Sequence, residues 1–231
     1  MRSLVLWDVD LTLVDLSGVG HSWYDQALSE VTGRSLQELP CCAGRTEQWI
    51  TTEVLTSHGV EASPAMIRRM WDRLIAVAAA AGETLSASGR ALPGADRALA
   101  ALAERSDVVQ SLVTGNLAEI ARHKLAAFEL DEHIDFEIGG YGSLSALRDE
   151  LVEHAIARAT DKHGLAPESI VVIGDSPHDV TAARRHGATA VGVTTGRSTA
   201  AELYDSGADD VLRDLSDTSE VLDALVAVAA R

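Results

Sequence analysis

The sequence predicts an α/β fold in which helices cover both faces of a mostly parallel, doubly wound β-sheet. Short β-branched runs alternate with amphipathic helical stretches along most of the chain, which is typical of a parallel sheet. The 231 residues, 46% of them hydrophobic, suffice for one compact domain that carries a smaller insertion. A long helical stretch near the N-terminus, without a convincing strand, indicates where that insertion lies.

Six runs are predicted to form the strands of the sheet. They span residues 4–9, 108–113, 134–138, 170–174, 189–193 and 210–212. Helical patterns occupy residues 95–105, 117–128, 146–163, 178–186, 198–206 and 218–230. Start and stop signals flank several of these helices, such as Pro93-Gly94 before one and Gly187 after another.

Residues 15–88 are predicted to form a small helical cap domain inserted directly after the first strand. Two amphipathic helices are expected within it. The apolar residues of the first are Trp23, Ala27, Leu28 and Val31. The second begins with Ser63 as N-cap and Pro64 at its first position, and it stops at Gly82. Residues 1–14 and 89–231 would then form the α/β core.

The charge and cysteine content restrict the partners of the protein. A formal net charge of -16, without a dense run of Lys and Arg, disfavours nucleic acid and anionic membranes as partners. The two cysteines, Cys41 and Cys42, are adjacent and unsuited to staple a fold, which indicates a reducing compartment. Neither a signal peptide nor a long apolar span is apparent. We therefore expect a cytoplasmic protein, monomeric or homodimeric, that acts on a small molecule.

Polar residues follow three of the predicted strands at the point where each strand ends. They are Asp8 and Asp10, then Thr114, Gly115 and Asn116, and finally Asp175 and Asp179. In an open parallel sheet, ligands bind at the carboxyl ends of the strands, so these residues are expected to share one site. A cluster of carboxylates repels itself without a cation, and Mg²⁺ prefers oxygen ligands of this kind. The sequence therefore predicts a Mg²⁺ site at this edge of the sheet.

These motifs resemble the haloacid dehalogenase (HAD) superfamily, in its branch of phosphatases similar to phosphoglycolate phosphatase. The first motif, D-x-D-x-T, is present as Asp8, Asp10 and Thr12; the second is Thr114 in "LVTGN", and the fourth is "GDSPHD". The resemblance extends from about Leu4 to Arg197. The helical insertion looks like the mobile cap of this family. The resemblance implies a Rossmann-like core, Mg²⁺ as cofactor and a small phosphorylated metabolite as substrate.

The resemblance also implies a role for each residue of the site. Asp8 would attack phosphorus to form an aspartyl-phosphate, and Asp10 would protonate the leaving oxygen and later deprotonate the attacking water. Thr114 and the N–H groups of Gly115 and Asn116 would hold the phosphoryl oxygens. The metal ligands would be Asp8, the main-chain carbonyl of Asp10, Asp175 and, in the first or second shell, Asp179.

The chain departs from the family pattern at two positions. Leu11 stands where related phosphatases commonly have Gly, and altered packing rather than lost chemistry is expected. The usual K-P-x-P segment, whose Lys stabilises the phosphoryl group, is absent, so Arg148 and Lys124 compete for this role. Arg148 falls in the first turn of the helix predicted at 146–163, at the active edge, whereas Lys124 lies about 12 Å along its helix. Geometry therefore favours Arg148, and Lys124 is expected to be a surface or salt-bridged residue.

The insertion should choose the substrate, and Arg45 is its candidate clamp for a carboxylate or a second phosphate. The presence of Asp10 favours hydrolysis of a phosphate ester, either phosphoglycolate-like or a sugar phosphate, over dehalogenation. Two alternatives stay open. A phosphosugar mutase would use the same residues, and a non-catalytic protein could use the same fold to bind a phosphorylated ligand.

Overall fold

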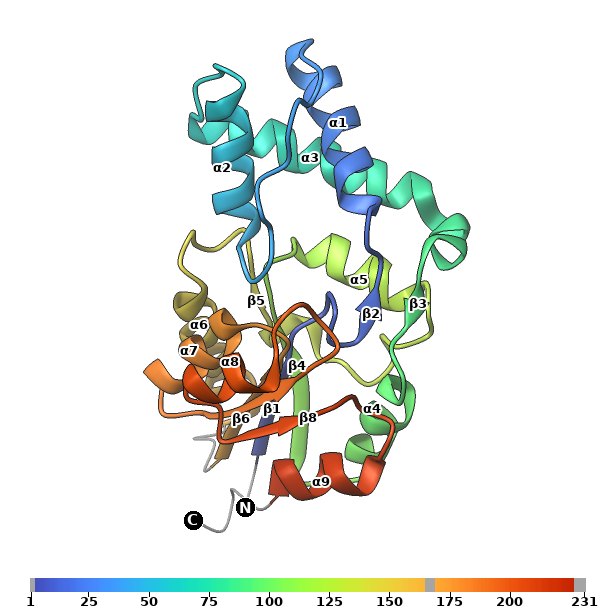
Figure 1. Cartoon of the computed structure of the whole chain (residues 1–231), viewed down its shortest axis with the longest axis vertical. Coiled ribbons are helices and arrows are strands. Elements are labelled where there is room, and N and C mark those ends of the chain that lie inside the picture. Colours follow the sequence, from blue (N-terminus) through green and yellow to red (C-terminus); the bar gives the residue numbers. More distant parts are fainter. Residues whose placement is uncertain (1–2, 165–168, 227–231) are drawn as a thin grey trace.

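Helices cover both faces of a six-stranded parallel sheet in the computed structural model, which describes residues 3–164 and 169–226 (Figure 1). The strand order is β5-β4-β1-β6-β7-β8, and every neighbouring pair is parallel. The strands are β1 (Ser3–Trp7), β4 (Val108–Thr114), β5 (Gly140–Tyr141), β6 (Ser169–Gly174), β7 (Thr189–Val193) and β8 (Asp210–Leu212). The helices on the sheet are α4 (Ala95–Ala103), α5 (Ala118–Ala126), α6 (Arg148–His163), α7 (Pro177–Arg185), α8 (Ala200–Asp205) and α9 (Thr218–Val226). The predicted fold class is confirmed.

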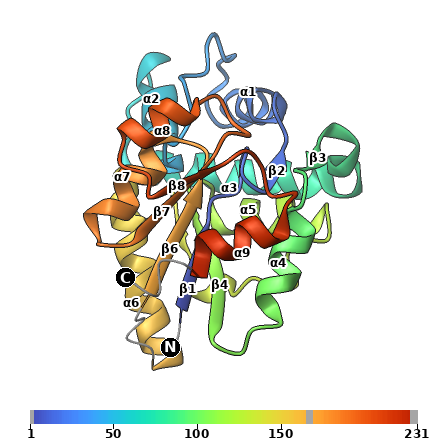
Figure 2. The ribbon, with the colours of Figure 1, turned by 60° about the horizontal axis from the view of Figure 1, so that its bottom comes forward.

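Alternate residues of β1 contribute to two separate hydrophobic clusters, one on each face of the sheet. Val5 and Trp7 lie in the cluster that contains the buried residues of α4, α5 and α9. Leu4 and Leu6 lie in the cluster formed with α6, α7 and α8. Because successive side chains of a strand point to opposite faces, a strand buried on both sides is continuously apolar. Figure 2 shows α4 and α9 together on one side of the strands.

The prediction of a strand at residues 134–138 is wrong. Phe136–Ile138 forms a short 3₁₀ turn, η2, and the edge strand of the sheet is instead Gly140–Tyr141. The Asp135 side chain accepts a hydrogen bond from the Glu137 N–H at 3.1 Å and so caps the turn. Such side-chain caps compete with extended backbone, which explains why the alternating apolar pattern did not produce a strand here.

The other predicted strands and helices are present, with their ends shifted by a few residues. The helix expected at 146–163 begins at Arg148, which places this residue in its first turn. The helix expected at 218–230 begins at Thr218 and is described as far as Val226, and residues 227–230 of this prediction lie outside the described residues.

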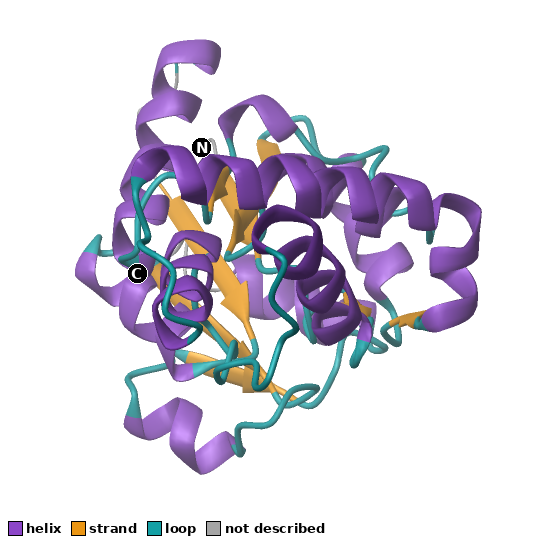
Figure 3. Cartoon of the chain, turned by 90° about the horizontal axis from the view of Figure 1, so that it is seen from above, coloured by secondary structure: helices purple, strands orange, loops and turns teal. Residues whose placement is uncertain are grey.

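Residues 16–89 form a helical segment that is inserted between two short strands and is called the inserted segment below. It contains α1 (Val19–Thr32), α2 (Glu47–Ser57), α3 (Pro64–Ala81) and the 3₁₀ helix η1 (Gly82–Ser88). The flanking strands β2 (Val14–Asp15) and β3 (Arg90–Ala91) pair antiparallel, so the chain leaves and re-enters the core at one place. The segment lies above the carboxyl ends of the sheet strands in Figure 1, and Figure 3 shows its helices from above.

The helix α3 follows its sequence signals closely. The Ser63 hydroxyl accepts a hydrogen bond from the Met66 N–H at 3.3 Å, and Pro64 occupies the first position of the helix. Met70, Leu74 and Val77 are buried, and α3 packs against α1 and α5. The prediction of this helix is confirmed. Neither α3 nor any other helix of the described residues combines the length and apolar character that crossing a membrane requires.

Candidate active site

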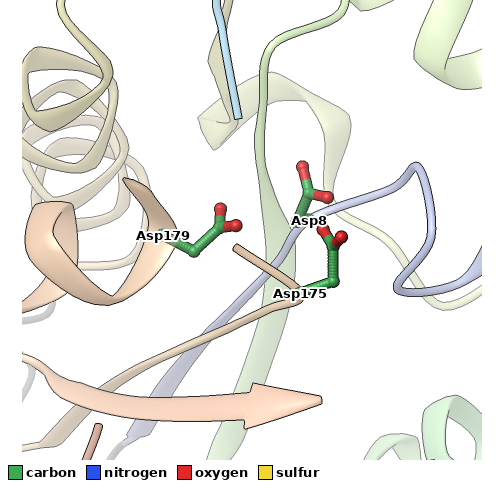
Figure 4. Close-up of side chains that lie close together, drawn as sticks. All are labelled: Asp8, Asp175 and Asp179. Atoms are coloured by element: carbon green, nitrogen blue, oxygen red, sulfur yellow. The ribbon is translucent and has the colours of Figure 1, made fainter. Parts of the chain in front are cut away.

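Two neighbouring strands and the helix after one of them bring three carboxylates together. Asp8 directly follows β1, Asp175 directly follows β6, and Asp179 lies in the first turn of α7. One oxygen atom of each residue lies within 4.8 Å of the others, and all three residues are buried. Figure 4 shows their carboxylates directed toward one common space. The predicted meeting of these acidic residues at one edge of the sheet is confirmed, and we call them the carboxylate cluster.

Local hydrogen bonds fix the orientation of Asp179. Its Oδ2 accepts from the Ser176 N–H at 3.1 Å and from the Ser176 hydroxyl at 2.6 Å, which completes a capping box at the start of α7. Its Oδ1 is buried and accepts no hydrogen bond within the described residues, although it forms an ion pair with Arg148 at 2.5 Å. Arg148 is therefore the cation that this oxygen contacts in the structure.

Arg148 is buried against the carboxylate cluster from the first position of α6. Its guanidinium lies 2.6 Å from Oδ1 of Asp8 and 2.5 Å from Oδ1 of Asp179, and it also donates to the Val113 carbonyl at 3.2 Å. Only 6% of the Arg148 side chain is exposed, so it belongs to the interior of the site and not to the helix surface. Arg148 thus lies where the sequence predicted a cation.

Lys124 also reaches the site, where it is salt-bridged to Asp10; of the two expected states, surface or salt-bridged, the structure shows the second. Its ammonium group lies 2.7 Å from both carboxylate oxygens of Asp10 and 2.7 Å from Oδ1 of Asn116, and the Lys124 side chain is only 12% exposed. The prediction measured only the rise along α5. Side chains of a helix lean toward its N-terminus, and the long Lys side chain spans the remaining distance.

The turn after β4 connects Thr114 to Asp10. Oγ1 of Thr114 accepts from the Asn116 N–H at 3.3 Å and from the Asn116 side-chain amide at 2.8 Å. The same amide donates to Oδ2 of Asp10 at 2.8 Å. Thr114 is fully buried, and the carbonyl of Gly115 accepts from the Glu47 N–H at 2.8 Å. Because Thr114 accepts two hydrogen bonds, its own hydroxyl hydrogen is available to a ligand.

Asp10 has different partners from the residues of the carboxylate cluster. Its carboxylate is 44% exposed, is held by Lys124 and Asn116, and is not a member of the cluster. The predicted metal ligand was its main-chain carbonyl, and this part stays a prediction. The next residue, Leu11, has φ 62°, a left-handed conformation that favours glycine. Leu11 thus adopts the backbone conformation that glycine favours, although its side chain differs from the family pattern.

The carboxylate cluster carries more negative than positive charge. Burial raises the pKa of Asp8 to about 7 and the pKa of Asp175 to about 8, and neighbouring carboxylates add to both effects. Arg148 opposes these shifts. Burial alone would lower the pKa of Arg148, but Asp179 and Asp8 raise it above its ordinary value. One guanidinium among three buried carboxylates leaves a site that favours a further cation.

A cavity of about 260 Å³ lies between this edge of the core and the inserted segment. Its walls include the predicted site residues Asp8, Asp10, Thr114, Gly115, Asn116, Arg148, Asp175 and Arg45. Arg45 is exposed, and its guanidinium stacks 4.5 Å above the ring of Trp49. Arg45 therefore lines the cavity as an exposed residue, and its role as a clamp stays a prediction.

Glu47 is a buried residue of the cavity wall that the sequence did not indicate. It begins α2, is 7% exposed, and accepts a hydrogen bond from the Tyr24 hydroxyl. Burial raises its pKa to about 7. The sequence signal was the N-cap Thr46 one residue earlier, which predicts a helix start but not that this start faces the site.

Comparison with known proteins agrees with this geometry. A family model described as haloacid dehalogenase-like hydrolase matches residues 5–184. A phosphoglycolate phosphatase of Mannheimia succiniciproducens is 29% identical over 140 residues, which is 61% of this chain and 61% of that protein. A 5'-nucleotidase of Pseudomonas aeruginosa is 32% identical over 107 residues, 46% of this chain and 45% of that protein. The matched region thus spans less than two thirds of the length of these relatives.

Solved structures share the fold over nearly the whole chain. A hydrolase from Pseudomonas syringae has a TM-score of 0.66 and 24% identity, covering 96% of this chain and 98% of that one. CbbY from Rhodobacter sphaeroides, in complex with phosphate, has a TM-score of 0.69 and 17% identity, covering 96% and 100%. With the family match over most of the sequence, the chain belongs to the haloacid dehalogenase-like hydrolases.

Proposed function

We propose that the protein is a Mg²⁺-dependent phosphatase that hydrolyses a small phosphomonoester through an aspartyl-phosphate at Asp8. The observation that carries this proposal is that Asp8, Asp10 and Thr114 line one cavity together with Asp175 and Arg148. A nucleophile, a proton carrier and groups that bind an anion are then all within reach of one ligand. The curated relatives named phosphoglycolate phosphatase support the same reaction class.

The residues of the carboxylate cluster fit a magnesium ion. Mg²⁺ takes oxygen ligands and commonly one or two carboxylates, and here three buried carboxylates lie within 4.8 Å of one another. Oδ1 of Asp179 is already paired with a cation, the Arg148 guanidinium at 2.5 Å, which shows that this position favours positive charge. Asp8, Asp175 and Asp179 would hold the ion, with the main-chain carbonyl of Asp10. When bound, it would neutralise the charge between nucleophile and phosphoryl oxygens.

In the proposed reaction, Asp8 is the nucleophile and Asp10 is the general acid and base. An Asp8 oxygen attacks phosphorus, the bond from phosphorus to the ester oxygen breaks, and Asp10 gives a proton to that leaving oxygen. Water then attacks phosphorus and Asp10 takes its proton. The bond from phosphorus to the Asp8 oxygen breaks, which releases inorganic phosphate and restores the Asp8 carboxylate. Lys124 and Asn116 hold both oxygens of the Asp10 carboxylate, which fixes the direction in which it faces the cavity.

The phosphoryl oxygens would be held by the turn after β4 and by Arg148. The Thr114 hydroxyl hydrogen is available, and Gly115 offers a main-chain N–H before α5, whereas the Asn116 N–H would have to leave Oγ1 of Thr114 to bind a phosphoryl oxygen. Arg148 lies 2.6 Å from Asp8, so it would also contact the phosphoryl group once that group is bonded to Asp8, and would stabilise its negative charge. We therefore assign Arg148 to the phosphoryl group and Lys124 to Asp10.

The inserted segment would act as a cap that excludes water from the reaction. The Glu47 N–H donates to the Gly115 carbonyl at 2.8 Å, and the Gln48 N–H donates to the Gly142 carbonyl at 2.9 Å. These bonds join the start of α2 to loops of the core. We propose residues 15–88 as this cap domain and residues 1–14 with 89–231 as the core. Opening and closing of the cap would admit substrate and then shield it.

The physiological setting is proposed from composition and chemistry. A small phosphorylated metabolite suits a cavity of about 260 Å³. Cys41 and Cys42 are both free thiols, in keeping with a reducing cytoplasm. We propose a monomer or homodimer that acts there without nucleic acid or membrane.

Phosphate release from a panel of phosphomonoesters, measured with MgCl₂ and with EDTA, tests the proposal. We expect turnover that requires the metal, that differs among esters and that Asp8→Asn abolishes. Failure of the folded wild-type protein to release phosphate from any ester would contradict the phosphatase proposal. Exchange of phosphate between sugar positions, without net release, would identify the mutase alternative.

A further inference from the structure

Glu47 is held rigidly against the core at the wall of the cavity. Its N–H donates to the Gly115 carbonyl at 2.8 Å, so its main chain is fixed to the phosphoryl-binding turn. Its side chain lines the same cavity as Asp10 and Lys124, and the residue is 7% exposed. Burial of an unpaired carboxylate destabilises a protein, so a buried Glu in the wall of a phosphatase site suggests a function in the site.

A chain of hydroxyl groups within the inserted segment ends on Glu47. The Trp71 indole N–H donates to Oγ1 of Thr51 at 3.0 Å, and the Thr51 and Tyr24 hydroxyls lie 2.9 Å apart. Tyr24 has a single hydroxyl hydrogen, and it goes to Oε1 of Glu47. The Thr51 hydroxyl is then a donor, either to Tyr24 or to Glu47, with which it also makes a side-chain hydrogen bond. Every hydrogen in this chain is ordered toward the carboxylate, which favours Glu47 as an acceptor.

Glu47 forms no ion pair within the described residues, although the positive charge of Lys124 partly offsets the rise of its pKa. No Lys, Arg or His of residues 3–164 and 169–226 lies within ion-pair distance of its carboxylate. Lys124 lies in the same cavity wall, but its three hydrogens serve the two oxygens of Asp10 and the side-chain oxygen of Asn116. A carboxylate accepts about four hydrogen bonds, so Glu47 retains capacity for a donor from the cavity.

We infer that Glu47 selects phosphate esters whose leaving group carries a hydroxyl or ammonium donor, and that it rejects leaving groups ending in a carboxylate. This inference rests on the proposed function, since it names the substrate class of the same site. Most other walls near the inserted segment are apolar: Leu16, Trp23, Leu39, Ile50 and Leu74. A donor on the leaving group would find its acceptor in Glu47. Above about pH 7, where Glu47 is ionised, a carboxylate would meet a like charge in a poorly solvated place.

This specificity separates the chain from the relatives named phosphoglycolate phosphatase, because the leaving group of phosphoglycolate ends in a carboxylate. Arg45 and Arg197 also line the cavity, but both are exposed, and Arg45 is stacked on Trp49. They lie where solvent screens their charge, whereas Glu47 is buried. We therefore expect Glu47, rather than Arg45 or Arg197, to determine which leaving group is preferred.

Three esters that differ only in their terminal group test the inference: 2-hydroxyethyl phosphate, phosphoethanolamine and phosphoglycolate. We would measure kcat/KM for each with MgCl₂ in the wild-type protein, in Glu47→Gln and in Glu53→Gln. Glu53 lies on the same helix, is exposed, and provides a matched control for the same chemical change. Ratios between esters are compared because a general loss of activity cancels in them.

We expect wild type and Glu53→Gln to prefer the hydroxyl and ammonium esters over phosphoglycolate. In Glu47→Gln this preference should fall roughly tenfold or more, since a site built for a substrate donor loses its acceptor charge. Preference of the wild type for phosphoglycolate, or equal ratios in wild type and Glu47→Gln, would overturn the inference while leaving the phosphatase proposal intact.

Absence of phosphate release from every ester would contradict the proposed function instead. The inference would then be decided by calorimetric titration of the same three esters into the same three proteins with MgCl₂. The same order of affinities, and its loss in Glu47→Gln, is expected. Binding of phosphoglycolate in preference to the other two, equal preference in wild type and Glu47→Gln, or no binding of any ester, would overturn it.

Discussion

The ammonium group of Lys124 lies 2.7 Å from both carboxylate oxygens of Asp10, across 114 positions of the sequence. This contact joins α5 to the loop after β1 and fixes the residue proposed as general acid and base. Removing it in Lys124→Met should lower kcat by about tenfold to a hundredfold, with a smaller effect on KM, because Asp10 loses its orientation. Lys162→Met, on the surface of α6, is the matched control. Equal kcat in wild type and Lys124→Met would refute this role.

Arg148 balances two buried carboxylates at once, so its loss should destabilise the protein. Arg148→Ala leaves Asp8 and Asp179 without their ion pairs, and we expect the free energy of unfolding in EDTA to fall by about 3–5 kcal/mol. Added MgCl₂ should restore part of the loss if the ion occupies the carboxylate cluster. Urea unfolding of the variant with and without Mg²⁺ measures both effects. A variant as stable as wild type in EDTA would contradict the assigned pairing.

The carboxylate cluster predicts how the stability of the metal-free protein depends on pH. Burial raises the pKa of Asp8 from 3.8 to about 7 and that of Asp175 from 3.8 to about 8. At a pH between the unfolded value of 3.8 and the folded values of about 7 and 8, the folded protein binds more protons than the unfolded chain. Its stability therefore falls as the pH rises through this range. From about pH 5.5 to about pH 8.5 we expect a loss on the order of 5 kcal/mol from the two groups together.

Urea unfolding in EDTA across this range measures that slope. Asp175→Asn removes one of the titrating groups and should flatten the dependence, and MgCl₂ should stabilise the wild type most at the alkaline end. Stability that rises over the same window, or an unchanged slope in Asp175→Asn, would show that the cluster does not carry these shifts.

Leu11 has a left-handed backbone conformation, φ 62°, in the loop that contains Asp10, and this conformation lowers the stability of the folded state. Comparing Leu11→Gly with Leu11→Ala isolates this cost, because both variants lose the same apolar side chain beyond Cβ. Leu11→Gly should be more stable than Leu11→Ala by about 1 kcal/mol, as only glycine adopts this conformation freely. Thermal unfolding of the two variants decides the point, and an order in which Ala is the more stable would contradict the backbone argument.

Much of the core could be predicted from the sequence because its signals are local. Apolar runs such as 170–174 and 189–193 are long enough to identify strands buried on both faces, and parallel pairing then places the residues after them at one edge. Residues 134–138 misled the prediction because a side-chain cap at Asp135, invisible in the apolar pattern, replaced extended backbone with a turn.

The missed parts of the site depend on contacts between distant segments. Lys124 reaches Asp10 through the direction and length of its side chain, which a count of residues along α5 does not include. Glu47 is buried because α2 begins against the Gly115 turn of the core. Nothing in the residues around Glu47 indicates that partner, so only the folded arrangement reveals the carboxylate in the cavity wall.

The central claim is that Asp8 carries the phosphoryl group during turnover. The most direct test is acid quench of the wild-type protein during steady turnover of a good ester with MgCl₂, followed by peptide mass spectrometry. We predict a phosphorylated peptide with the modification on Asp8, absent from Asp8→Asn and from protein quenched without substrate. Rapid turnover with Asp8 unmodified, or undiminished turnover in Asp8→Asn, would contradict the account.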